Sequence, residues 1–247
     1  MNRKIFGYAV ALVFLAFLTM FPLTVGALAN GSASTTWGNI KIGADFAKLA
    51  PPLNFYTRLV VPFFPQVSPD SPITDWKLSM NCGQASVLNC VGYLKRVCYP
   101  YPAIVIADEN KWLAKTYNEP RYLNKYGYFT GGDKIVRLEG LARNYWGLKN
   151  SVATTNYCAS IDALYNELKV GRPVVVEVMT NMVSAPDDNN TYHFMVLVGL
   201  SIGTNDTNSY VWVNDVGKTA GKSIKYTLQQ FKKSWATSGN HCVFIRP

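Results

Sequence analysis

Histidine and charged side chains are scarce in this 247-residue sequence. It contains two histidines, its charged residues make up 16% of the chain, and no two cysteines stand in a Cys-x-x-Cys pair. Structural zinc sites are usually built from such cysteine pairs and from histidines, so we expect no metal and no other cofactor. The basic residues are scattered and no internal repeat is present, which argues against a nucleic-acid-binding stripe and a repeat protein.

The composition also excludes a disordered chain. Hydrophobic residues make up 49% of the sequence and aromatic residues 13%, which is enough for a full core in one large domain, with or without extensions. The formal net charge of +9 favours acidic partners or an anionic cell surface. We expect a monomer with no nucleic acid among its partners.

The N-terminus has the pattern of a targeting segment. A basic start with Arg3 and Lys4 precedes the largely apolar residues 5–29, and Ala27-Leu28-Ala29 matches a small-x-small cleavage site. We predict that residues 1–29 are a signal peptide. Without cleavage, the apolar residues 5–29 are long enough to attach the chain to a membrane. In both cases the protein is secreted or otherwise extracytoplasmic.

Residues 30–58 are small, polar and proline-containing, and we predict that they form a linker or extension. The remaining residues, 59–247, are predicted to form the folded domain. Helix patterns come first and strand patterns later, which is typical of the α+β class. We therefore expect helices gathered on one side of an antiparallel sheet. The expected strands are residues 59–66 at a sheet edge, 174–178, 193–200, 210–215 and 243–245. The expected helices are residues 104–117 and four helices that begin after Asn81, Asp133, Ser160 and Thr227.

Disulfides can form in an extracytoplasmic compartment, so the odd number of cysteines is informative. The sequence has five, at positions 82, 90, 98, 158 and 242. Among several possible schemes, we expect Cys90 to pair with Cys98 and Cys158 with Cys242. This arrangement leaves Cys82 as a free thiol.

Cys82 also stands where a helix favours the thiolate. Asn81 and Gln84 form a capping-box pattern directly before an apolar run, which predicts a helix start with Cys82 in its first turn. The unpaired N–H groups and the positive dipole end of a helix favour an anion at that position. A thiolate is a nucleophile, but a buried or disulfide-bonded cysteine on an amphipathic helix has the same local pattern.

A histidine is expected beside an amide or a carboxylate. If the strands at 193–200 and 210–215 pair as an antiparallel hairpin, their outer ends meet, and His193 then lies beside Asn214 and Asp215. A cysteine–histidine nucleophile needs such a third group to hold the imidazole ring. The other histidine, His241, has no evident acidic partner in the sequence.

Several motifs together resemble one known family. They are Pro62-Phe-Phe-Pro-Gln66, Asn81-Cys82-Gly83-Gln84-Ala85-Ser86, Gly171-Arg172-Pro173-Val174, His193-Phe-Met-Val-Leu-Val-Gly199, Val213-Asn214-Asp215 and Thr227-Leu-Gln-Gln-Phe231. In order and spacing they are similar to the stand-alone relatives of the bacteriocin-processing (double-glycine leader) peptidases, which are papain-like cysteine peptidases. The resemblance covers residues 59–247. It implies a papain-like fold, with the nucleophile helix packed on an antiparallel sheet.

The resemblance also implies a role for each site residue. Cys82 is the implied nucleophile, His193 the general base and acid, Asp215 the group that orients the imidazole, and Gln66 the side-chain donor of the oxyanion hole. Gln84 is the rival for the last role, because the family glutamine usually lies closer to the cysteine than Gln66 does. The family usually has a proline where Gln84 stands.

The expected function is thiol-dependent hydrolysis of a peptide or amide bond in a peptide or protein substrate, through a thioester. Two alternatives use the same fold, namely an inactive peptide-binding module and a transpeptidase or acyltransferase.

Overall fold

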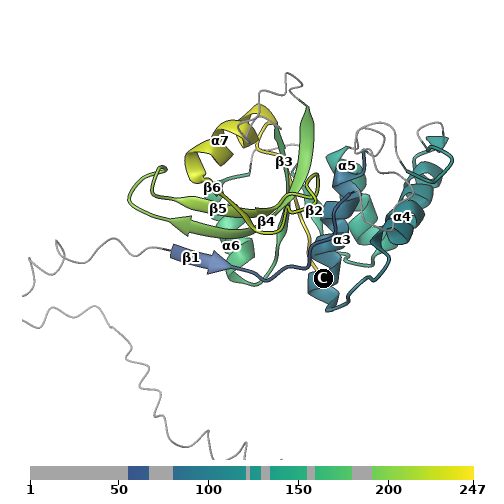
Figure 1. Ribbon diagram of the computed structural model, residues 1–247, viewed down its shortest axis with the longest axis horizontal. Helices are drawn as coiled ribbons and strands as arrows, with labels where there is room; N and C mark the ends of the chain where they lie inside the picture. Colours follow the sequence, from purple (N-terminus) through teal and green to yellow (C-terminus); the bar gives the residue numbers. More distant parts are fainter. Residues whose placement is uncertain (1–54, 67–79, 121–122, 129–133, 155–158, 180–190) are drawn as a thin grey trace, which may run out of the picture. The chain divides into compact units, whose positions relative to one another are not determined.

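The computed structural model describes residues 55–66, 80–120, 123–128, 134–154, 159–179 and 191–247 (Figure 1). All described residues belong to one compact unit within residues 51–247. The predicted signal peptide and most of the predicted linker lie outside the described residues. No helix within the described ranges is long and apolar enough to span a bilayer.

The described residues form one antiparallel sheet in the order β2-β7-β3-β4-β5-β6, with β1 also paired to β4. The central strand β4 is long enough to pair with two strands along the same edge. Strand β3 pairs with its first half and β1 with its last residues. The strands are β1 Phe55–Arg58, β2 Val152–Ala153, β3 Val174–Met179, β4 Tyr192–Ile202, β5 Tyr210–Asn214, β6 Ile224–Thr227 and β7 Cys242–Phe244.

Five α-helices and one π-helical turn are described. They are α3 Cys82–Lys95, α4 Pro102–Thr116, α5 Ile135–Gly140, the π-helix η3 Leu141–Tyr145, α6 Ile161–Lys169 and α7 Leu228–Thr237. Two predicted caps are confirmed: Ser160 accepts a hydrogen bond from the N–H of Ala163, and Thr227 forms a complete capping box with Gln230. The predicted cap Asp133 lies outside the described residues.

Helix α3 begins at Cys82, as predicted, but the capping box is not formed. The Asn81 side chain makes no cap hydrogen bond; its Oδ1 accepts one from Nδ2 of Asn110 on α4, at 2.7 Å. Both asparagines are fully buried, so this contact satisfies polar atoms that water cannot reach. Asn81 therefore joins α3 to α4 instead of closing the first turn of α3.

Strand β3 buries both of its faces, which corrects the expectation of helices on one side only. Val174, Val176 and Val178 of β3 pack with α6 and α7, whereas Val175 packs with α3, α4 and α5. Side chains alternate between the two faces of a strand, so each layer of helices covers one face. Figure 1 shows α3, α4 and α5 grouped together beside the sheet.

The predicted edge strand at 59–66 is also wrong. The strand ends at Arg58, and residues 59–66 continue without regular structure, although the N–H of Leu59 still donates to the carbonyl of Val198 at 2.7 Å. Pro62 and Pro65 lack the N–H groups that a ladder needs, which explains why strand pairing stops before them.

Candidate active site

Cys82 and His193 come together where the start of α3 meets the first residues of β4. Cys82 is the first residue of α3 and is partly exposed, and its side chain is close enough to the His193 imidazole to raise the pKa of that ring. The His193 side chain is only 12% exposed. The structure thus brings together two residues that are 111 positions apart in the sequence.

Asp215 holds the other side of the imidazole ring. Its Oδ1 lies 2.9 Å from Nε2 of His193 and also accepts a hydrogen bond from the N–H of Gly217 at 3.1 Å. Because Nε2 is engaged by Asp215, Nδ1 is the ring nitrogen that remains for Cys82. The predicted hairpin geometry is confirmed: β4 pairs with β5 up to the match of Val196 with Asn214, and Asp215 follows directly.

Asn214 does not face the imidazole. Its Nδ2 donates to the carbonyl of Pro62 at 3.1 Å and to Oδ1 of Asn89 at 3.3 Å, and its Oδ1 accepts from the N–H of Ser223 at 2.9 Å. The sequence left open whether an amide or a carboxylate contacts the imidazole. In the structure this group is the Asp215 carboxylate.

The electrostatics of the site favour a charged imidazole. Burial alone lowers the pKa of His193, but hydrogen bonds with Asp215 and Cys82 and the negative charges of both raise that pKa from 6.5 to about 10. Burial raises the pKa of Asp215, yet the hydrogen bond and charge of His193, the charge of Lys218 and the N–H of Gly217 together lower it. The arrangement therefore favours an imidazolium paired with the Asp215 carboxylate.

A short loop after Asp215 holds this carboxylate, and sequence analysis missed it. The N–H of Asp215 donates to the carbonyl of Gly221 at 2.8 Å, and Nζ of Lys218 lies 3.4 Å from Oδ2 of Asp215. A Cβ added to Gly221 would lie 1.8 Å from the Asp215 carbonyl oxygen, and one added to Gly217 would lie 3.0 Å from Cε1 of His193. The two glycines are the signal in the sequence, since close backbone approach excludes a side chain.

Gln66 and Gln84 are both buried close to these residues. The N–H of Gln66 donates to the carbonyl of Val216, the residue after Asp215, at 2.8 Å, and the residue is 5% exposed. Gln84 lies in α3, two residues after Cys82, and is fully buried. The oxyanion role of either residue stays a prediction.

The predicted disulfide between Cys90 and Cys98 is not formed. All four described cysteines, Cys82, Cys90, Cys98 and Cys242, are free thiols. Cys90 lies inside the core on α3, whereas Cys98 is exposed beyond the C-terminal end of that helix. Cys158, the expected partner of Cys242, lies outside the described residues.

His241 has the acidic partner that the sequence did not reveal. Its Nδ1 lies 3.2 Å from Oε2 of Glu177, because β7 pairs with β3 and places residues 64 positions apart side by side. Within the described ranges, no group of three or more histidine, cysteine, aspartate or glutamate side chains is arranged to hold a metal ion.

Comparison with known proteins supports the papain-like α+β fold that the resemblance implied. A candidate C39-like peptidase from Bacillus anthracis has a similar crystal structure, with a TM-score of 0.52 and 19% sequence identity over 78% of this chain and 98% of that one. No curated protein matches the sequence. The model of the Peptidase C39 like family matches residues 58–243, which is more than half of the chain. The protein therefore belongs to this C39-like family, a group of cysteine-peptidase type with the papain-like fold.

Proposed function

We propose that the protein is a thiol-dependent peptidase or amidase with Cys82 as nucleophile, His193 as general acid and base, and Asp215 as the orienting group. The observation that carries this proposal is that Asp215 Oδ1 lies 2.9 Å from Nε2 of His193, while Cys82 is close enough to the same ring to raise its pKa. A nucleophile, a base in contact with it and a third group that holds the base are the parts that acyl transfer needs.

The reaction has two stages. The Cys82 thiolate attacks the carbonyl carbon of the scissile amide, a carbon–sulfur bond forms, and the carbonyl electrons move onto oxygen. When the tetrahedral intermediate collapses, the carbon–nitrogen bond breaks and the His193 imidazolium gives its proton to the leaving amine. The neutral imidazole then takes a proton from water, the hydroxide attacks the thioester, and release of the acid restores the thiolate and the imidazolium.

The oxyanion of each tetrahedral intermediate needs hydrogen-bond donors. The N–H of Cys82 at the start of α3 is one candidate, and the Gln66 side chain is the other. Loss of one oxyanion donor typically lowers kcat by about 10²–10³. Gln66→Ala should therefore lower kcat more than Gln84→Ala does. The opposite result would identify Gln84 as the side-chain donor.

The nucleophile is tested without knowledge of the substrate. Iodoacetamide should alkylate Cys82 faster in the folded protein than in the urea-unfolded protein, and His193→Ala should remove this difference. Cys98→Ala is the matched control, since it deletes an exposed thiol outside the site. If Cys82 is alkylated no faster in the folded protein than in the unfolded protein, the thiol is not activated. The peptide-binding module of the same fold would then be the better interpretation.

Substrate turnover separates hydrolysis from acyl transfer. A peptide library should be cleaved by the protein and not by Cys82→Ala, and the acyl group should appear as a free acid. Diversion of most of the acyl group to an added amine would identify a transpeptidase or acyltransferase that uses the same residues.

The site is proposed to act outside the cytoplasm as a monomer. The support is the basic, apolar and small-x-small pattern of residues 1–29. N-terminal sequencing of the exported protein should give Asn30 as the first residue. Recovery of the uncleaved chain in the membrane fraction would instead identify residues 5–29 as an anchor.

A further inference from the structure

One half of the sheet carries a group of aromatic and basic side chains that stay partly or largely exposed. On β5, Val211 and Val213 are fully buried against α6 and α7, whereas the alternate residues Tyr210 and Trp212 are only partly buried. Tyr56 on β1 is 59% exposed and stands edge-on to Trp212, with 5.5 Å between the ring centroids. Aromatic rings that are grouped on a sheet face and stay partly exposed can mark a binding site.

The strand register explains how this group is assembled. Arg58 on β1 lies opposite Gly199 on β4, Gly199 opposite Trp212, and Trp212 opposite Lys225 on β6. Gly199 has no side chain, so Arg58 reaches across it and lies 5.4 Å from the centroid of the Trp212 ring. A Cβ at Gly199 would come within 3.1 Å of both Arg58 and Trp212. We name this surface, made of Tyr56, Arg58, Tyr210, Trp212, Lys222 and Lys225, the β1–β6 platform.

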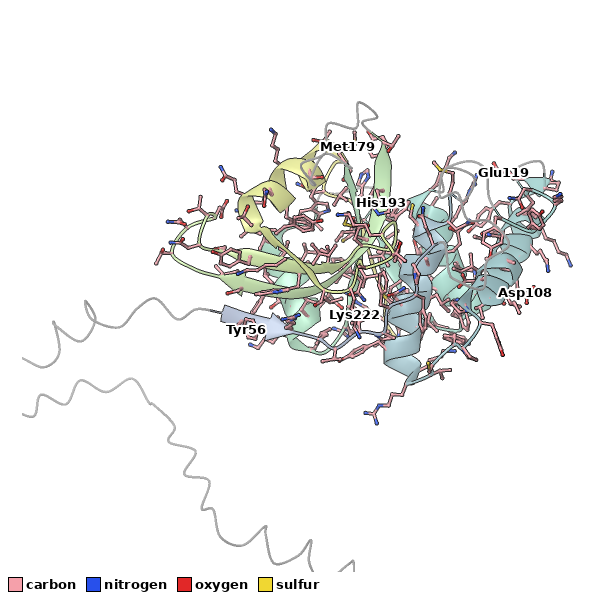
Figure 2. All side chains as sticks on the ribbon, in the orientation of Figure 1. Tyr56, Asp108, Glu119, Met179, His193 and Lys222 are labelled. Atoms are coloured by element: carbon pink, nitrogen blue, oxygen red, sulfur yellow. The ribbon has the colours of Figure 1, made fainter. Side chains whose placement is uncertain are left out.

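A cavity of about 490 Å³ opens beside the platform. Arg58, Lys222 and Ser223 contribute its polar side, and Leu59, Val60 and Val61 its apolar side. Figure 2 labels Tyr56 and Lys222, which both line this cavity, on the same side of the sheet. No aspartate or glutamate lines it, so its charge is positive.

Carboxylates of the described residues do not neutralise the basic residues of the platform. Among the described residues, no carboxylate forms an ion pair with Arg58, Lys222 or Lys225. The nearby contacts of Arg58 are neutral: the Ser223 hydroxyl, 2.8 Å from Nη2, and the Trp212 ring. Uncompensated positive charge over an open surface attracts an anionic ligand.

The backbone beside the platform favours a peptide over other anions. In the described part of the chain, β1 pairs only with β4, so its other edge has no strand partner, and Val60 just beyond it is 83% exposed. An extended peptide can pair its backbone with such an edge while its side chains reach the neighbouring pocket. We propose that the β1–β6 platform and its cavity bind an extended acidic peptide segment, whose carboxylates meet Arg58 and Lys222.

The test is a binding measurement that needs no turnover. A fluorescein-labelled oligoglutamate peptide is titrated into the full-length chain carrying Cys82→Ala, and anisotropy is compared with that of an oligoglutamine peptide of equal length. The oligoglutamate should bind, and more weakly as salt rises from about 0.05 to 0.5 M. Arg58→Gln combined with Lys222→Gln should weaken binding about tenfold.

A matched pair of variants separates the effect of the platform on peptide binding from the effect of net charge. Lys115→Gln with Lys169→Gln removes the same charge from exposed positions on α4 and α6, and binding should be unchanged. Equal weakening in both pairs, or no binding of oligoglutamate, would overturn the proposal. So would tighter binding of a labelled oligothymidylate that the platform variant abolishes, because that result identifies a nucleic-acid surface. If circular dichroism shows that the Arg58 variant is unfolded, Lys222→Glu carries the same comparison.

Discussion

His193 keeps its proton at neutral pH because a carboxylate lies on one side of the ring and a sulfur on the other. The two contacts raise its pKa from 6.5 to about 10 although burial opposes the charge. In the proposed reaction the imidazolium donates the proton to the leaving amine, so activity is lost as pH rises through this pKa. In the proposed mechanism, the alkaline limit of activity is therefore set by Asp215, Cys82 and the groups that contact them.

Asp215→Asn tests this dependence, because asparagine keeps the shape of the side chain and removes its charge. The pKa of His193 should fall, so the alkaline limb of the kcat/KM profile should move from about 10 toward 6.5. Lys218→Gln is the matched variant: it removes a positive charge beside Asp215, and the same limb should move to higher pH. Profiles that shift in the same direction for both variants would contradict this account.

The loop from Gly217 to Gly221 acts as an element that positions Asp215. Gly217 and Lys218 contact the carboxylate directly, and Gly221 accepts the Asp215 N–H. None of these contacts belongs to a strand or a helix, so no periodic pattern in the sequence indicates them. The spacing of the glycines is the one visible trace.

Gly221→Ala should therefore damage the site. A Cβ 1.8 Å from the Asp215 carbonyl oxygen must displace one of the two segments, with a loss of about 1–3 kcal/mol in unfolding free energy and a strong loss of kcat. Gly147→Ala is the control: it has a φ of +72° and no atom within 4 Å of the added Cβ, so it should lose about 1 kcal/mol and keep full activity. Urea denaturation and kcat measured on both variants check this.

Asn89 on α3 joins three elements through its buried amide. Its Nδ2 donates to the carbonyls of Phe64 and Ala85, and its Oδ1 accepts from the Phe64 N–H and from Nδ2 of Asn214. The amide thus ties the segment before Gln66 to both the nucleophile helix and the end of β5.

Asn89→Ala should leave several buried polar groups without partners and reduce the unfolding free energy by roughly 3 kcal/mol. Asn166→Ala, at an exposed position on α6, should change it by less than about 0.5 kcal/mol. Equal stability of the two variants in urea denaturation would show that water replaces the contacts of Asn89.

At the scale of the domain, two helical layers and the sheet between them decide which thiols solvent reaches. Cys90 and Cys242 lie in the two cores on opposite faces of the sheet, and burial raises the pKa of each, to about 12 for Cys242. Cys82 is partly exposed and Cys98 is exposed.

This arrangement predicts which cysteines a thiol reagent can modify in the folded protein. In the folded protein, a disulfide reagent should modify Cys82 and Cys98 within the first minutes, and Cys90 and Cys242 only after unfolding in urea. Mass spectrometry of the digested protein identifies each modified cysteine. Recovery of a peptide with Cys90 joined to Cys98 would contradict the structure.

The sequence by itself determined the local features: the start of α3 at Cys82, the caps at Ser160 and Thr227, the β4–β5 hairpin and hence the meeting of His193 with Asp215. These follow from short-range hydrogen bonds and from side-chain periodicity, which neighbouring residues control. Only the tertiary structure decided that Asn81 bonds to Asn110, that helices cover both faces of β3, that Glu177 reaches His241 and that Cys90 stays free in the core. Each of these depends on which distant segments pack together, and packing is a property of the whole chain rather than of any stretch of it.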